Sequence, residues 1–285
     1  MSANRWTIGR VRITRVVEIE GPTPGRFILP EAAPERIQEI GWLRPHFATE
    51  TGKILTSVHA FIVESAGRRI LVDTCVGNDK LRPGIPNWNL RHGPFLDDLA
   101  SAGFAPESID TVVCTHLHVD HVGWNTMLVE GRWVPTFPRA RYLIGRDEWQ
   151  FWGRHEAEAF GDVVGDSVRP VLDAGLVDLV ASDLVITDEV RLEPTHGHTP
   201  GHVSVRIASA GEDAIITGDV MHHPCQMARP EWVCRFDVDA AAARVTREQF
   251  LARHAARPIL VLGTHFASPS AGRIVPDGVA YRFEV

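Results

Sequence analysis

The chain has 285 residues, of which 44% are hydrophobic and 23% are charged, and its formal net charge is −7. This composition is ordinary for a globular protein and excludes a disordered or fibrous chain. No block of lysine and arginine stands out, so the sequence has no electrostatic footprint for nucleic acid or an anionic membrane. No apolar run approaches the roughly 20 residues that a membrane-spanning helix needs. We therefore expect a small, neutral or mildly polar substrate, and neither nucleic acid nor a membrane as a partner.

The N-terminal 20 residues carry scattered charges and lack the uninterrupted apolar stretch of a secretory signal. This predicts a cytoplasmic protein. Its cysteines are widely spaced and form no Cys-x-x-Cys pair; they are Cys75, Cys114, Cys225 and Cys234. Without a secretion signal, such cysteines are expected to be reduced, buried thiols.

The first half of the chain is rich in strand-like patterns. They cover residues 11–20, 54–65, 70–75 and 108–116. The short segment AGRR (residues 66–69) is the expected turn of a hairpin, and residues 93–104 predict an amphipathic helix. Two segments rich in Pro and Gly, residues 21–37 and 81–94, are expected to lie on the surface near the mouth of a pocket.

The second half repeats this alternation of strands and helices. Strand-like runs cover residues 140–145, 176–180, 184–194, 202–209, 213–219 and 258–265. Residues 146–160 and 239–256 predict helices. This order suggests sheets inside and helices outside, so we predict an α/β (α+β) fold, a four-layer αββα sandwich, as one domain over residues 1–285.

Histidine-bearing turns follow several of these strand-like runs. The turn at residues 114–121 reads CTHLHVDH, and later turns contain HGHTPGH, TGD and GTH. They provide seven candidate metal ligands: His116, His118, Asp120, His121, His198, Asp219 and His265. Seven ligands are too many for one tetrahedral zinc ion but suit two ions that share a bridging carboxylate.

The spacing within the first turn supports two ions. Residues two positions apart on an extended segment point the same way, so His116 and His118 can reach one ion together. Where the strand gives way to the next element, Asp120 and His121 point to another side and can serve a second ion.

With H-x-H-x-D-H, H-T-P-G-H, TGD and GTH together, the chain resembles the metallo-β-lactamase superfamily over residues 10–275. The resemblance implies a first metal held by His116, His118 and His198. It implies a second held by Asp120, His121 and His265, with Asp219 bridging both. The family motif H-T-x-G-H selects His198, which leaves supporting roles for His196 and His202. Asp73, also in a common motif of the superfamily, is expected to orient a ligand histidine rather than bind metal.

A two-metal site predicts hydrolysis by a hydroxide shared between the ions. Asp120 is well placed to relay a proton besides binding metal. Zinc is the first expectation for the two divalent ions, although manganese, cobalt or iron also suit imidazole and carboxylate ligands.

Within the superfamily, several branches fit less well. No inserted nucleic-acid-binding arm is visible, no export signal marks a class B β-lactamase, and the C-terminal tail lacks the basic residues of glyoxalase II-like chains. Quorum-quenching lactonases tend to have a tyrosine three residues after the bridging aspartate, which donates a hydrogen bond to the substrate carbonyl; here that position is His222. We place the chain nearest to the methyl parathion hydrolase and N-acyl-homoserine lactonase-like branch, whose members are often homodimers.

The expected function is therefore binuclear hydrolysis of a small-molecule lactone or carboxylic ester, with Asp120 and His222 as catalytic residues. Phosphotriester hydrolysis is the alternative within this fold, because it uses the same bridging hydroxide. A non-catalytic metal-binding scaffold and an iron-dependent persulfide dioxygenase are further alternatives.

Aromatic residues near the ligands are candidates for the substrate pocket. Trp124 and Phe266 are preferred, because each lies within three residues of a ligand. Trp88 and Met127 are further candidates, whereas Trp149 and Trp152 on the predicted helix are expected to be core residues.

Overall fold

The computed structural model describes residues 4–154, 160–255 and 257–285. Within these residues, one seven-stranded sheet has the order β1-β2-β3-β4-β5-β8-β9. Neighbours from β1 to β4 pair antiparallel, and β4, β5, β8 and β9 pair parallel. The strands are β1 (Asn4–Ile8), β2 (Val11–Thr23), β3 (Ile54–Ser65), β4 (Arg68–Val72), β5 (Thr111–Cys114), β8 (Arg141–Gly145) and β9 (Val177–Val180).

The second seven-stranded sheet follows the sequence order from β10 to β16. Its neighbours pair antiparallel except β13 and β14, which are parallel. The strands are β10 (Val185–Thr187), β11 (Val190–Pro194), β12 (Val203–Ser209), β13 (Glu212–Ile216), β14 (Leu260–Leu262), β15 (Ala271–Asp277) and β16 (Ala280–Glu284). A separate hairpin is formed by β6 (Thr126–Val129) and β7 (Arg132–Pro135).

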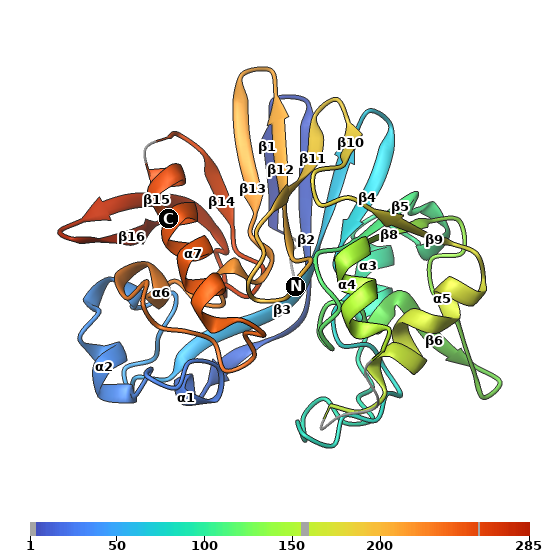
Figure 1. Cartoon of the computed structure of the whole chain (residues 1–285), viewed down its shortest axis with the longest axis horizontal. Coiled ribbons are helices and arrows are strands. Elements are labelled where there is room, and N and C mark those ends of the chain that lie inside the picture. Colours follow the sequence, from blue (N-terminus) through green and yellow to red (C-terminus); the bar gives the residue numbers. More distant parts are fainter. Residues whose placement is uncertain (1–3, 155–159, 256) are drawn as a thin grey trace.

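Helices lie outside the two sheets, which occupy the centre of Figure 1. On one side are α3 (Phe95–Ser101), α4 (Arg146–Trp152) and α5 (Arg169–Asp173); on the other are α6 (Cys225–Ala228) and α7 (Ala240–Ala255). Two short helices, α1 (Gly25–Ile28) and α2 (Pro34–Gln38), lie beside α6. The remaining turns are η1 (Gly41–Leu43), η2 (Pro106–Ser108), η3 (Gly123–Asn125), the π-helical η4 (Val164–Val168) and η5 (Gly218–Val220). The layers are those of the predicted αββα sandwich.

Alternation along the strands explains why both faces of each sheet are buried. On β3, Phe61 and Val63 face the other sheet, whereas Ala60 and Ile62 face the layer of α3. Because successive side chains of a strand point to opposite faces, a continuous apolar run serves two cores at once. On the second sheet, Ile215 packs toward α7. The sandwich thus has one core between the sheets and one beneath each helical layer.

The predicted elements mostly exist, with shifted ends. The hairpin of residues 54–75 is β3 and β4, and the helix predicted at residues 239–256 is α7. The helix predicted at residues 146–160 is shorter, because α4 ends at Trp152; residues 155–159 lie outside the described residues. The tail after residue 270 was not predicted to be β structure, yet it forms β15 and β16. In the described part of the chain, no helix is both long and apolar enough to cross a membrane.

Candidate metal centre

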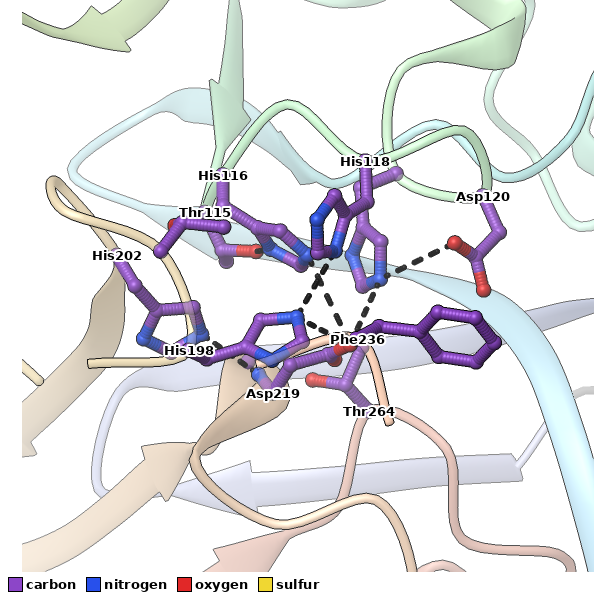
Figure 2. Close-up of polar contacts among 12 residues, drawn as sticks. Thr115, His116, His118, Asp120, His198, His202, Asp219, Phe236 and Thr264 are labelled. Carbon is purple, nitrogen blue, oxygen red and sulfur yellow. Dashed lines mark hydrogen bonds and ion pairs between the residues drawn. The ribbon is translucent and has the colours of Figure 1, made fainter. Parts of the chain in front are cut away.

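Turns that follow β5, β11, β13 and β14 meet at one edge of the sandwich. They cover residues 115–121, 195–202, 217–219 and 263–265. Backbone hydrogen bonds join them: the N–H of Val203 donates to the carbonyl of Thr115, and the N–H of Thr217 donates to the carbonyl of Leu262. Figure 2 shows histidine and aspartate side chains from these turns pointing toward one another. The structure therefore brings all seven candidate ligands together.

The first group of donors comprises His116, His118, His198 and Asp219, whose ligand atoms lie within 4.8 Å of one another. Nδ1 of His118 lies 2.9 Å from Nε2 of His198. Nε2 of His116 and Nε2 of His198 lie 3.7 and 3.5 Å from Oδ2 of Asp219. Donors bound at 2.0–2.1 Å around a tetrahedral ion are about 3.3 Å apart. This group therefore fits one ion.

The second group comprises Asp120, His121 and His265. The two Nε2 atoms lie 3.2 Å apart, and the Asp120 carboxylate oxygens lie 3.8 Å from His121 and 3.6 Å from His265. Asp219 also reaches this group, because its Oδ1 lies 3.2 Å from Nε2 of His265 and its Oδ2 lies 3.4 Å from Nε2 of His121. Asp219 thus lies between the two groups, where a bridging ligand would be.

The hydrogen bonds of the imidazole rings show which nitrogens are available. In four of the five rings, Nδ1 is within 2.8–3.1 Å of a protein oxygen, from Thr115 for His116, Asp73 for His121, Asp237 for His198 and Ser57 for His265. Donation through Nδ1 leaves the inward Nε2 with a free lone pair, the form that binds metal. Nε2 of His116 is buried and has no hydrogen-bond partner among the described residues. Lone pairs that face one another at these distances need a cation between them, so the donors fit metal ions.

Asp73 lies where β4 ends, in the left-handed region with φ +58°. Its carboxylate accepts hydrogen bonds from the backbone N–H and the hydroxyl of Thr115, at 2.8 and 2.9 Å, and lies 2.9 Å from Nδ1 of His121. The Thr115 hydroxyl is in turn 3.1 Å from Nδ1 of His116. Asp73 therefore orients one histidine of the second group directly and one of the first group through Thr115.

Asp237 has a similar position, which the sequence analysis missed. Its side chain is fully buried; Oδ1 lies 2.8 Å from Nδ1 of His198, and Oδ2 accepts the backbone N–H of Cys234 at 2.8 Å. It comes from the loop before α7, 39 residues after His198. No motif surrounds it, so only the fold reveals this contact.

The supporting role expected for His202 has a clear geometry. Its Nε2 accepts the backbone N–H of Asp219 at 2.7 Å, and its Nδ1 lies 2.9 Å from the carbonyl of Thr195. His202 thereby fixes the turn that carries Asp219. His196 contributes differently, because its carbonyl accepts the hydroxyl of Thr246 on α7 at 2.6 Å.

Burial and charge divide the histidines into two kinds. Burial lowers the pKa of His116 and His198 well below the ordinary value and that of His118 to about 4, which keeps these rings neutral. Burial also disfavours charge on His121 and His265, but Asp219 and Asp120 outweigh it and raise the pKa of both rings. The carboxylates thus attract positive charge to the second group.

His222 lies beside both groups. Its Nε2 is 3.2 Å from Oδ2 of Asp219, and its ring stacks over that of His265 with 6.0 Å between centroids and 10° between planes. It also faces the cavity, so its ring can contact a bound molecule. Together with Cys234 and His198 it forms a third cluster of possible ligand atoms.

A cavity of about 290 Å³ opens onto this centre. Its apolar wall includes residues of both predicted mouth segments, as well as Trp152 and Phe236: Phe27, Ile28, Ile85, Trp88, Leu117, Val119, Trp152, Val163, Val164, Phe236 and Val238. The ring of Trp152 packs edge-to-face on His118 at 5.2 Å, so this residue is part of the pocket and not only of the core.

The pocket prediction fails for Trp124 and Phe266, because neither is among the residues that line the cavity. Trp124 is 4% exposed, donates from Nε1 to Glu18 at 2.7 Å and stacks on Phe95. Phe266 is fully buried against Phe47 and Phe283 in the core beneath α7. These rings are close to ligands in sequence but do not reach the cavity, because the chain turns back into the helical layers after each ligand. Met127 is likewise absent from the lining, whereas Trp149 packs against the core beneath α3, as expected of a core residue.

Comparison with known proteins agrees with this geometry. The sequence model of the metallo-beta-lactamase superfamily matches residues 54–265. An N-acyl homoserine lactonase of Bacillus thuringiensis is 21% identical over 243 residues, which cover 81% of this chain and 90% of the relative. Two solved structures superpose with a TM-score of 0.79 and cover 99% of this chain and 96% of theirs: the hydrolase AbOPH at 25% identity, and AidC, a dizinc quorum-quenching lactonase, at 18%.

The chain therefore belongs to the metallo-beta-lactamase superfamily. With the lactonase relatives, this membership makes it a metal-dependent hydrolase related to N-acyl homoserine lactonases at low identity.

Proposed function

We propose that this hydrolase uses two divalent metal ions to cleave an uncharged lactone or carboxylic ester. His116, His118 and His198 would hold the first ion, Asp120, His121 and His265 the second, and Asp219 would contact both. Zinc fits these imidazole and carboxylate donors and is the metal in the relative AidC.

One observation carries this proposal: two groups of buried or half-buried donors share Asp219, and the imidazole lone pairs in them face inward. A structural zinc site is closed by four protein ligands. Here Asp120 and His222 also line the cavity, so the centre is accessible to a small molecule. An accessible two-ion centre is a catalytic arrangement.

Divalent ions bound here would polarise the substrate carbonyl and lower the pKa of bound water. The protein side chains would hold and move the protons. Asp120, with its side chain 15% exposed, can take a proton from the attacking water and return it to the leaving alkoxide as the acyl C–O bond breaks. His222, which lines the cavity, can donate a hydrogen bond to the oxygen on which negative charge develops. The products are then a carboxylic acid and an alcohol, which remain one molecule when the substrate is a lactone.

The cavity wall supports an uncharged substrate with an apolar arm. Among the described residues that line it, none is Lys or Arg, and the acidic ones are Asp120, Asp162 and Asp219. Away from the proposed metal ions, an anionic group would find no Lys or Arg partner on this wall, whereas an acyl chain or aromatic ring would contact Phe27 and Phe236, whose rings pack edge-to-face at 5.7 Å.

The test is an activity screen on protein of measured metal content. Acylated homoserine lactones, aryl esters and a phosphotriester such as paraoxon are compared by kcat/KM on the same preparation. We expect two metals per chain, loss of activity with chelation, and the highest kcat/KM on a lactone or carboxylic ester. The proposal is wrong if the protein carries fewer than one metal per chain and chelators leave its ester hydrolysis unchanged. A much higher kcat/KM on the phosphotriester would mean that the substrate is a phosphotriester, and the proposed two-metal centre would still stand.

A further inference from the structure

Glu148 is a buried carboxylate next to the metal centre that has no part in the reaction described above. It lies on α4 and is 0% exposed. Its Oε1 accepts hydrogen bonds from the hydroxyl of Thr199 and from the backbone N–H of Gly201, the latter at 3.1 Å. Both donors belong to the turn at residues 195–202, which also carries His198.

The helix and this turn pack too closely for an intervening side chain. A Cβ atom on Gly201 would lie 2.6 Å from the backbone nitrogen of Glu148 and 2.9 Å from its Cγ. Glycine is thus required here by close approach. The position of α4 and that of the His198 turn are therefore linked by backbone packing as well as by the carboxylate.

The helix that carries Glu148 also contacts His118. The contact is made by Trp152, which lies one turn further along α4 and lines the cavity beside the metal centre. Leu117 lies between His116 and His118, and the Trp152 ring packs on His118 at 5.2 Å. The helix that carries Glu148 thus contacts both ligand-bearing turns of the first group, one through the carboxylate and the other through Trp152.

Burial raises the pKa of Glu148 to about 7 despite these hydrogen bonds. Burying such a group is costly unless its hydrogen bonds are satisfied, and a removed partner leaves donors unpaired. An apolar residue of the same size would avoid that cost, but it would not hold the donors in place.

We propose that Glu148 is a positioning residue that holds the turns of His118 and His198 in the geometry that binds the first metal ion. This role of Glu148 rests on the proposed two-metal centre. The histidines of the second group are oriented by other residues: His121 by Asp73 and His265 by the carbonyl of Ser57. A change at Glu148 should therefore affect the two ions unequally.

The experiment compares Glu148→Gln with Asp147→Asn, an exposed neighbour on the same helix that undergoes the same change of charge. Glutamine keeps the volume of Glu148, but its neutral oxygen accepts the hydrogen bonds of Thr199 and Gly201 more weakly than a carboxylate does. Zinc-loaded proteins are titrated with a chelator, and metal release, kcat and KM are measured. We expect the first ion of Glu148→Gln to bind about 10–100-fold more weakly, as for other residues that orient ligands, while the second ion is retained. Asp147→Asn should match the wild type.

A second pair of variants tests the proposal if Glu148→Gln does not fold. Thr199→Val removes one donor to the carboxylate at nearly constant volume, and Thr199→Ser restores it. The first should weaken the same ion, and the second should rescue it. Unchanged metal release in both Glu148→Gln and Thr199→Val would overturn the proposal, even if the unfolding temperature fell. If the wild type binds two metals but hydrolyses no lactone or ester, the proposed substrate fails, whereas metal release still decides the role of Glu148.

Discussion

Asp237→Asn tests whether the contact of Asp237 with Nδ1 of His198 keeps the lone pair of its Nε2 directed at the metal site. The Asp237 carboxylate lies 2.8 Å from Nδ1 of His198 and accepts the backbone N–H of Cys234 at 2.8 Å. Asparagine has the same shape but only one acceptor atom, so one of these two contacts becomes a donor facing a donor. A hydrogen bond to a charged group contributes about 1.5–3 kcal/mol. At about 1.4 kcal/mol per factor of ten, we expect metal affinity to fall about 10–100-fold.

The assay is zinc binding to metal-free protein in competition with a chromogenic chelator. Asp239→Asn is the matched control: it is exposed in the same loop, and asparagine can replace the Asp239 carboxylate that accepts the N–H of Ala242 at the start of α7. The reasoning is refuted if Asp237→Asn binds zinc as tightly as the wild type while its unfolding temperature is unchanged.

Three further predictions concern turnover, pH and metal removal. Asp120→Ala should lower kcat/KM about 10²–10⁴-fold with an unchanged circular dichroism spectrum, and near-normal turnover would remove Asp120 from the proton relay. The Lys80 side chain is fully buried, and burial lowers its pKa to about 7. Between that pH and the unfolded pKa of about 10.4, only the unfolded chain binds the proton, so stability should rise with pH by at most about 1.4 kcal/mol per unit. Denaturant titrations of Lys80→Met from pH 7 to 9 should lack this contribution, and an equal slope in both proteins would contradict it. Chelation should lower the free energy of unfolding by about 4 kcal/mol for each bound ion, relative to protein in metal at 1,000-fold Kd, and added zinc should restore it. A melting temperature that does not change with metal would argue against binding to the folded state.

The metal-ligand candidates could be found from the sequence because their chemistry is local. His116 and His118 lie two positions apart after an apolar strand, and few other reasons bring three histidines and an aspartate into six positions. The αββα layers were predictable for a similar reason, since apolar runs such as residues 54–65 imply strands that are buried on both faces.

The pocket and the supports of the ligands were decided by the tertiary structure. Trp124 and Phe266 are close to ligands in sequence, yet they pack into the helical layers, whereas Phe236 reaches the cavity from a distant loop. Asp237 and Glu148 carry no motif at all, because a hydrogen bond from a carboxylate to a distant turn leaves no spacing pattern in the chain. Donor type and strand period are local properties, so the candidate metal ligands could be predicted from the sequence. Only the packing of two sheets and their helices decided which carboxylates orient those donors and which side chains enclose the substrate.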